Sequence, residues 1–219
     1  LSIRRQRQMC IRDSYSRIES SDKIKAKKSC NFSEKNFSVL MVSSLRKDES
    51  KDPMTLVKAA KYIMMMDDNI DFYIAGDGER RNELEQAINE NNIYNIKLLG
   101  NRSDVEKLLT AADISVLTSK TEGISNSILE SMACGTPVIA TSRGGTEEII
   151  ENGKSGFITT YGDYKLLTEK IVFMKNNPEV REKFAQRGQK IITEKFSIQT
   201  MIDNFKKIVT DTIYETKES

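Results

Sequence analysis

Short apolar segments alternate with longer helix-like segments along most of this chain, and this alternation limits the possible folds more than any other feature. Six segments rich in β-branched or aromatic residues predict strands, at Phe37–Val42, Asp71–Ala75, Ile96–Leu99, Ile114–Leu117, Pro137–Thr141 and Gly156–Thr159. The segments between and after them predict helices at Pro53–Met66, Glu79–Glu90, Ser103–Ala111, Asn126–Ala133, Thr146–Glu151, Tyr164–Lys175, Pro178–Lys195 and Ile198–Thr216. Strands joined by helices are typical of a parallel sheet covered on both faces. We therefore expect an α/β fold with a doubly wound, Rossmann-like parallel sheet.

Polar or glycine-containing segments follow most of the predicted strands. They lie at Ser43–Lys51, Gly76–Gly78, Gly100–Arg102, Ser119–Ser127 and Arg143–Thr146. Ligands of doubly wound sheets bind outside the carboxyl ends of the strands, and these ends share one edge of the sheet. The sequence therefore predicts a single site to which all these segments contribute.

The stretch Thr121–Ala140 carries the strongest functional pattern. Two carboxylates, Glu122 and Glu130, lie eight positions apart, and a predicted helix begins between them. A helix N-terminus offers unpaired backbone N–H groups and a partial positive charge to an anion, above all to phosphate. Carboxylates on either side can accept hydrogen bonds from hydroxyl groups at the two ends of a ligand whose middle is a diphosphate. A nucleotide sugar is such a ligand.

This stretch resembles the signature of glycosyltransferase family 4, the group 1 retaining glycosyltransferases. In that family a Glu, seven residues and a second Glu precede Ala-x-Gly-x-Pro-Val, and here Glu122 and Glu130 precede Ala-Cys-Gly-Thr-Pro-Val. Segments that follow the family's order, such as KDPMTLVKAA, IAGDGERRNELE and RGGTEEIIENGKSGFI, extend the resemblance over roughly residues 37 to 210. The resemblance implies the two-domain GT-B fold, with this chain as its C-terminal, donor-binding half. It also implies retention of anomeric configuration and no obligatory metal ion.

The resemblance assigns roles to individual residues. It implies that Glu122 contacts the transferred sugar, Glu130 binds the ribose hydroxyls and Lys51 pairs with the diphosphate. We take Glu122 and Lys51 as the catalytic candidates. The substrate-binding candidates are Glu130, Gly123, Ile124, Ser125, Asn126, Ser127, Arg46, Gly76, Asn101 and Arg102.

Purely structural roles for the same residues stay open. Positions 127 and 130 fit a capping box, and the polar residues at 125–127 fit helix caps. Glu122 can be a solvated loop acid, Lys51 a surface lysine at a helix entry, Gly76 a turn residue and Arg102 an exposed arginine.

The loop after the first strand departs from the family pattern. The family has Gly-Arg-Leu here, whereas this chain has Ser43-Ser44-Leu45, so the arginine is missing at Ser44. Either Arg46 or Lys47 is expected to supply the second positive charge.

Composition excludes several classes of protein. The net charge is +2 with 30% charged residues, which shows no nucleic-acid footprint. No apolar run approaches the ~20 residues needed to cross a bilayer. The three cysteines show neither metal nor disulfide spacing, which fits a reducing cytosol, and no histidine is present.

The first residues differ from the rest of the chain. Residues 1–14 resemble a translated sequencing adapter, and we expect them to be non-native; the alternative is a basic arm. Residues 15–36 are polar and predict a linker, so the expected domain organisation is a non-native or disordered segment over 1–36 and a nucleotide-sugar-binding domain over 37–219. A sugar or lipid-linked acceptor would bind a missing N-terminal domain. Membrane association, at the inner face, is expected only through that half.

The sequence therefore predicts a cytoplasmic sugar transferase that uses a nucleoside-diphosphate sugar as donor substrate and needs no cofactor. Transfer of a hexose-type sugar to a hydroxyl acceptor is the expected reaction, and this fragment alone is expected to be inactive. The alternatives are a nucleotide-sugar epimerase, a phosphorylase-like enzyme of the same fold, or a non-catalytic nucleotide-sugar-binding subunit.

Overall fold

The computed structural model of the chain describes residues 20–47, 50–121, 123–142, 144–197, 199–200, 202 and 206. Residues 1–14, the catalytic candidate Glu122 and Arg143 lie outside the described residues. The predicted helix Ile198–Thr216 lies largely outside them.

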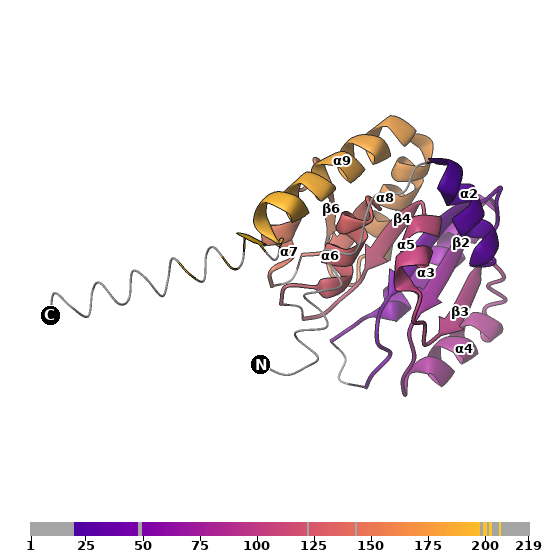
Figure 1. Cartoon of the computed structure of the whole chain (residues 1–219). Coiled ribbons are helices and arrows are strands. Elements are labelled where there is room, and N and C mark those ends of the chain that lie inside the picture. Colours follow the sequence, from indigo (N-terminus) through magenta and orange to yellow (C-terminus); the bar gives the residue numbers. More distant parts are fainter. Residues whose placement is uncertain are drawn as a thin grey trace, which may run out of the picture.

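Six parallel strands form one sheet in the order β3-β2-β1-β4-β5-β6 (Figure 1). The strands are β1 (Phe37–Val42), β2 (Ile70–Ala75), β3 (Ile96–Gly100), β4 (Ile114–Leu117), β5 (Val138–Thr141) and β6 (Gly156–Thr159). Every neighbouring pair is parallel. This is the strand order of a doubly wound Rossmann-type sheet, so the predicted fold class is confirmed.

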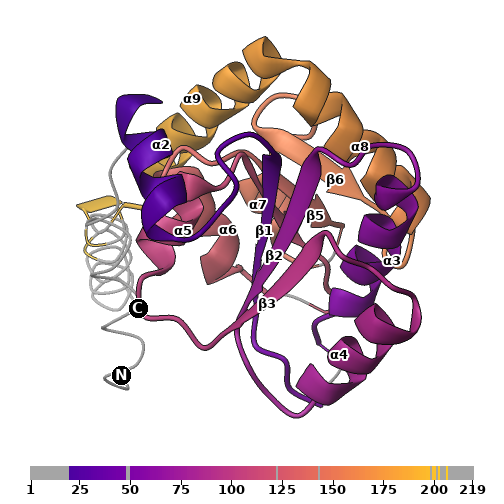
Figure 2. The same cartoon turned by 90° about the vertical axis from the view of Figure 1, so that its right-hand side faces the viewer.

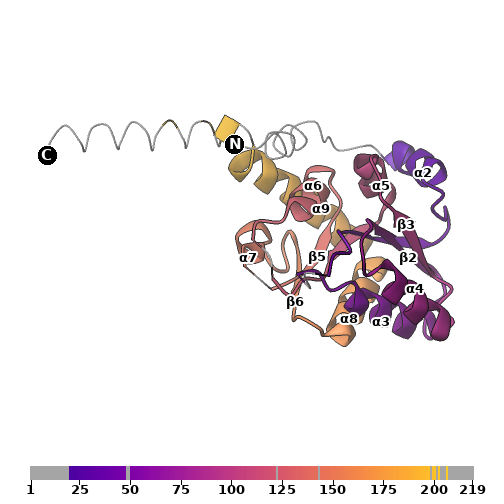
Figure 3. The same cartoon turned by 90° about the horizontal axis from the view of Figure 1, so that it is seen from below.

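Helices cover both faces of the sheet (Figure 2). One face carries α3 (Pro53–Met64), α4 (Arg81–Glu90) and α8 (Tyr164–Asn176), and the other carries α2 (Ser20–Ser29), α5 (Val105–Ala111) and α6 (Asn126–Ala133). The short α7 (Thr146–Ile149) lies between β5 and β6 in the chain, and α9 (Pro178–Lys195) packs on both α6 and α8 (Figure 3). The helix α9 therefore joins the two layers.

Buried aliphatic side chains fill both faces of the sheet. Leu56 and Ile63 of α3 pack with Ile171 of α8 on one face. Leu40 and Tyr73 pack with α5 on the other. Burial of such side chains supplies most of the driving force for folding, at ~25 cal/mol per Å² of apolar surface.

Helix starts follow local sequence. The Asp52 carboxylate accepts a hydrogen bond from the backbone N–H of Thr55, with Pro53 at the first helical position of α3. In the same way Asp163 caps α8 by accepting from the N–H of Leu166 at 2.9 Å. These signals explain why the predicted and observed starts of α3 and α8 agree.

The segment 15–36 differs from the expected linker wherever the structure describes it. Helix α2 occupies Ser20–Ser29 and packs on α5. After it, the buried ring of Phe32 stacks on the ring of Tyr73, with 3.6 Å between centroids. The sequence of α2 has no apolar stripe, so periodicity did not reveal the helix. Residues 20–36 therefore form part of the folded unit, while the non-native origin of residues 1–14 stays a prediction.

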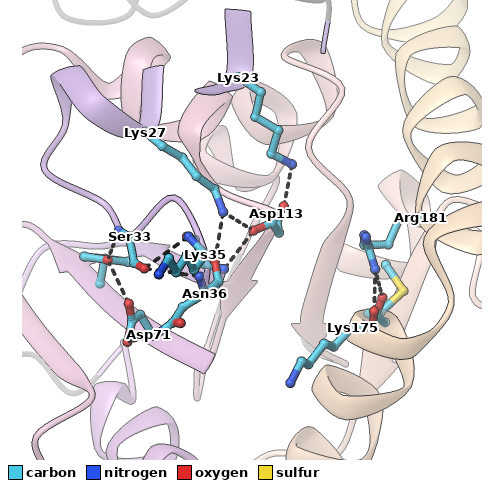
Figure 4. Close-up of polar contacts among 12 residues, drawn as sticks. Lys23, Lys27, Ser33, Lys35, Asn36, Asp71, Asp113, Lys175 and Arg181 are labelled. Carbon is cyan, nitrogen blue, oxygen red and sulfur yellow. Dashed lines mark hydrogen bonds and ion pairs between the residues drawn. The ribbon is translucent and has the colours of Figure 1, made fainter. Parts of the chain in front are cut away.

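An ion cluster attaches α2 to the amino end of the sheet (Figure 4). Lys23 and Lys27 contact the two carboxylate oxygens of Asp113 at 2.7 and 2.9 Å, and the N–H of Ser38 donates to the same carboxylate at 2.8 Å. Lys27 also donates to the carbonyl of Asn36. Burial alone would raise the pKa of Asp113, but the two lysines outweigh it and the pKa lies below its usual value.

Candidate functional site

A cavity of about 720 Å³ lies at the carboxyl edge of the sheet, beside the N-terminus of α6. The loops after β1, β2 and β3 form its other walls. This is the edge at which the sequence predicted a site. Nine of the candidate residues line the cavity: Arg46, Lys51, Gly76, Asn101, Arg102, Ile124, Ser125, Asn126 and Ser127.

Two candidates, Gly123 and Glu130, are absent from the lining of this cavity. Glu122 lies outside the described residues. Gly123 is exposed, and its carbonyl oxygen lies near Gly145, where an added Cβ would come within 3.2 Å. Glu130 is half-buried in the second turn of α6 and is absent from the cavity lining.

The two glycines after β2 bring the loops after β1 and β2 into close contact. Gly76 has φ +140°, and an added Cβ would lie 1.8 Å from the carbonyl oxygen of Ser43. Gly78 has φ +152°, and its Cβ would lie 2.3 Å from the carbonyl oxygen of Leu45. Both positions therefore require glycine for conformation and for space. Gly76 forms an antiparallel bridge with Gly100 and lines one wall of the cavity.

The end of β4 holds the backbone around Lys51. Lys51 forms an antiparallel bridge with Ser119. The N–H of Asp52 donates to the carbonyl of Thr118 at 2.9 Å, and the Thr118 hydroxyl donates to the carbonyl of Asp52 at 2.5 Å. Lys51 stands at a helix entry, as the structural alternative expected, but its backbone is tied to a second loop of the site.

The N-terminus of α6 is not capped by a side chain. Ser125 is the N-cap residue and makes no side-chain cap hydrogen bond; its hydroxyl lies 3.2 Å from the hydroxyl of Ser127. Ser127 is thus the second helical residue, and Glu130 lies beyond the position that a capping box uses. The capping-box interpretation is therefore wrong, because the helix begins two residues before the position it requires.

Glu130 lies near a buried thiol. Burial raises the pKa of Cys134 strongly, and the negative charges of Glu106 and Glu130 raise it further. Cys134 is therefore a protonated core thiol and a poor nucleophile.

Arg102 and Arg46 both lie on the cavity wall. Arg102 donates two hydrogen bonds to Asp104, at 2.8 and 2.7 Å, and these bonds lower the pKa of that carboxyl group. Arg46 lines the cavity together with Lys51, whereas Lys47 lines a neighbouring cavity of about 460 Å³. Geometry thus favours Arg46 over Lys47 as the replacement for the arginine missing at Ser44.

Some residues of the cavity wall belong to the segments predicted at this edge but were not named as individual candidates. Asp77, between Gly76 and Gly78, lines the cavity and accepts a hydrogen bond from the N–H of Gly78 at 2.8 Å. Ser43 and Ser44 line it as well. Their position directly after β1 was a usable signal.

Two features are absent from the part of the chain that the structure describes. No helix there combines the length and the apolar character needed to span a bilayer. Within the same residues, no group of three or more Cys, Asp or Glu side chains has the arrangement of a metal site.

The family model described as "Glycosyl transferases group 1" matches residues 22–191. Among curated proteins, an uncharacterized glycosyltransferase of Methanocaldococcus jannaschii is 32% identical over 144 residues, which is 65% of this chain and 41% of that protein. The N-acetyl-alpha-D-glucosaminyl L-malate synthase of Bacillus anthracis is 26% identical over 198 residues, which is 90% of this chain and 51% of that protein.

Among solved structures, Anabaena HepE in complex with UDP-glucose has a TM-score of 0.80 and 27% sequence identity. The match covers 89% of this chain and 54% of that one. The chain thus spans about half the length of the proteins that it matches.

Proposed function

The chain belongs to the group 1 glycosyltransferases, and from that premise we propose that it is the donor-binding half of a retaining hexosyltransferase. The proposed reaction moves a hexose-type sugar from a nucleoside diphosphate to a hydroxyl group of a sugar or lipid-linked acceptor. One observation carries the proposal: Lys51, Arg46 and the uncapped N-terminus of α6 line a single cavity at the carboxyl edge of the sheet.

The chemistry is cleavage of the bond between the anomeric carbon and the diphosphate oxygen. Negative charge develops on the leaving diphosphate as this bond breaks. Lys51 and the first-turn N–H groups at Asn126 and Ser127 would stabilise that charge without reorganisation. Because this stabilisation is larger for the leaving group than for the intact donor, it lowers the barrier to transfer.

The two carboxylates take the roles that the family resemblance implies. Glu122 would contact the transferred sugar, and Glu130 would accept hydrogen bonds from the ribose hydroxyls. For Glu130 this assignment is supported by the loss of the capping-box alternative. For Glu122 it rests on the resemblance alone.

Acceptor binding would require sequence outside the residues of this chain. The match covers only 51% and 54% of the length of two of these relatives. A complete two-domain cleft orients both substrates and excludes water. We therefore expect this chain alone to bind donor without transferring sugar to an acceptor.

Calorimetric titration with UDP, ADP and GDP, and with the matching nucleosides, tests the proposal. UDP is the first probe because HepE was solved with UDP-glucose. The chain should bind at least one diphosphate, and Lys51→Ala should weaken that binding about ten- to a hundredfold while leaving the bare nucleoside unaffected. Absence of binding by all three diphosphates contradicts the proposal.

A further inference from the structure

The guanidinium of Arg80 reaches Lys51 from a separate loop. Arg80 immediately precedes α4, and its Nη1 donates to the backbone carbonyl of Lys51 at 2.9 Å. Its Nε and Nη2 donate to the two carboxylate oxygens of Glu83 at 3.0 and 3.1 Å. The Arg80 side chain is only 15% exposed. Because the planar guanidinium is hydrogen-bonded to both Lys51 and Glu83, the Arg80 side chain has little conformational freedom.

The backbone of Arg80 also contacts the other flank of the segment that carries Arg46. Its N–H donates to the carbonyl of Leu45 at 3.0 Å. Arg80 is therefore hydrogen-bonded to Leu45, which precedes Arg46, and to Lys51. Arg46 and Lys51 are two of the three cations that line the proposed diphosphate cavity; the third, Arg102, pairs with Asp104.

Lys51 lies on the wall between two cavities. It lines the cavity of about 720 Å³ and also the neighbouring cavity of about 460 Å³, whose lining includes Arg80 and Glu83. Lys51 thus contributes to the walls of both cavities. Arg80 places a positive charge in the smaller cavity and pairs with Glu83, whose carboxylate would otherwise attract Lys51.

We propose that Arg80 is a positioning residue for donor binding: it holds the backbone of Lys51 and neutralises Glu83, so that the lysine ammonium meets the diphosphate. This inference rests on the proposed function. It adds a residue that itself has no place in the lining of the donor cavity.

A double-mutant cycle tests whether Arg80 acts through Lys51. The variants are Arg80→Gln, Lys51→Ala and the double variant, and the measurement is the affinity for the nucleoside diphosphate that the unmodified chain binds best. Arg80→Gln should lower that affinity roughly three- to tenfold, which lies in the lower part of the range of coupling between residues of one hydrogen-bond network. In the Lys51→Ala background the same change should have no further effect, because the side chain that Arg80 positions is gone.

Selectivity and folding provide the second readout. The affinity for the bare nucleoside should be unchanged in Arg80→Gln, since a nucleoside carries no charge for Lys51. Arg187→Gln is the matched control, because Arg187 also makes a two-bond pair with a carboxylate, Glu151, but on the surface of α9. It should leave both affinities unchanged. If Arg80→Gln fails to fold, Arg80→Lys replaces it and should lose less, because it keeps the charge without the fork.

Failure of this inference is separable from failure of the proposed function. If no diphosphate binds the unmodified chain, both are overturned. If a diphosphate binds and Lys51→Ala weakens that binding, but Arg80→Gln lowers the affinity equally in both backgrounds, then Arg80 does not act through Lys51 and only the positioning role is overturned. If Arg80→Gln lowers the affinities for the nucleoside and for the diphosphate equally, its role is merely structural. That result would also overturn the positioning role.

Discussion

The two ends of the same parallel sheet use basic side chains in different ways. At the amino end, Lys23 and Lys27 pair with the carboxylate of Asp113, whose side chain is 12% exposed (Figure 4). At the carboxyl end, Arg46 and Lys51 line a cavity of about 720 Å³. The first arrangement attaches a helix to the domain, whereas the second presents positive charge to a space that an anion from solution can enter.

The difference follows from how a doubly wound sheet is connected. At the carboxyl end the chain leaves each strand for a helix, so helix N-termini with their partial positive charge meet there and favour anions. At the amino end helices finish and strands begin, and Arg181 illustrates the result by donating to the carbonyls of Met174 and Lys175 at the end of α8. Substitutions at the amino end should therefore change stability, and those at the carboxyl end should change ligand binding.

The largest expected effect is at the amino end. Asp113→Ala should lower the free energy of unfolding by about 3–5 kcal/mol, because it leaves buried Lys27 and its neighbour Lys23 without their carboxylate. Urea denaturation measures this. Glu194→Ala is the control, since the Lys190–Glu194 pair is exposed and should change stability by less than ~0.5 kcal/mol. A loss below ~1 kcal/mol for Asp113→Ala would remove the contrast between the two ends.

The stabilisation by ionised Asp113 should also make stability depend on pH. This effect should be smaller than the effect of Asp113→Ala. The pKa of Asp113 is lowered in the folded protein, where the charges of Lys23 and Lys27 outweigh burial. The stabilisation is therefore complete above the unfolded pKa of ~3.9 and is lost as pH falls through the lower folded value. Urea denaturation at pH 2 to 6 should show this loss in the unmodified chain and a weaker one in Asp113→Asn. Identical profiles would refute the assignment.

At the carboxyl end, substitutions of Glu130 and Glu122 should affect the binding of different ligands. Glu130→Ala should weaken nucleoside diphosphate binding about ten- to a hundredfold, from the loss of a charge-assisted hydrogen bond. Glu122→Ala should leave that binding unchanged and reduce only the preference for the full nucleotide sugar. Calorimetry with both ligands measures this, after the folded fraction has been checked. Equal losses for both ligands in both variants would contradict the assigned roles.

The smallest expected effect distinguishes two neighbouring cations. Arg46→Ala should weaken diphosphate binding roughly three- to tenfold, because Arg46 lines the donor cavity and an exposed charge is partly screened. Lys47→Ala is its matched partner and should change the affinity by less than about twofold, since Lys47 lines the neighbouring cavity. The reverse order would mean that the loop after β1 rearranges when the ligand binds.

The sequence was sufficient for the sheet and for most helices because these depend on local patterns. β1, β4, β6, α6 and α9 have the predicted bounds, and the other predicted elements between residues 37 and 195 differ by one or two residues at one end. The candidate residues at the carboxyl edge were also predictable as a group, because any segment that follows a strand of a parallel sheet reaches that edge. Their individual roles stay predictions.

Helix α2 and the role of Arg80 were not predictable from the sequence. The contact between Lys27 and Asp113 joins residues 86 positions apart, and that between Arg80 and Lys51 joins residues 29 positions apart. Neither pair has a periodic spacing or a sequence motif. The capping-box alternative for Glu130 likewise depended on which serine begins α6.

The sequence by itself therefore determined the fold class, the order of strands and helices, and the edge of the sheet at which a ligand would bind. The tertiary structure decided which polar groups come into contact. Lys27 pairs with Asp113 at one end, and Arg80 donates to the backbone carbonyl of Lys51 at the other. The physical reason is that periodicity and caps act over a few neighbouring residues, whereas an ion pair or a side-chain hydrogen bond depends on a distance of ~3 Å between groups. That distance is set only when the strands and helices have packed.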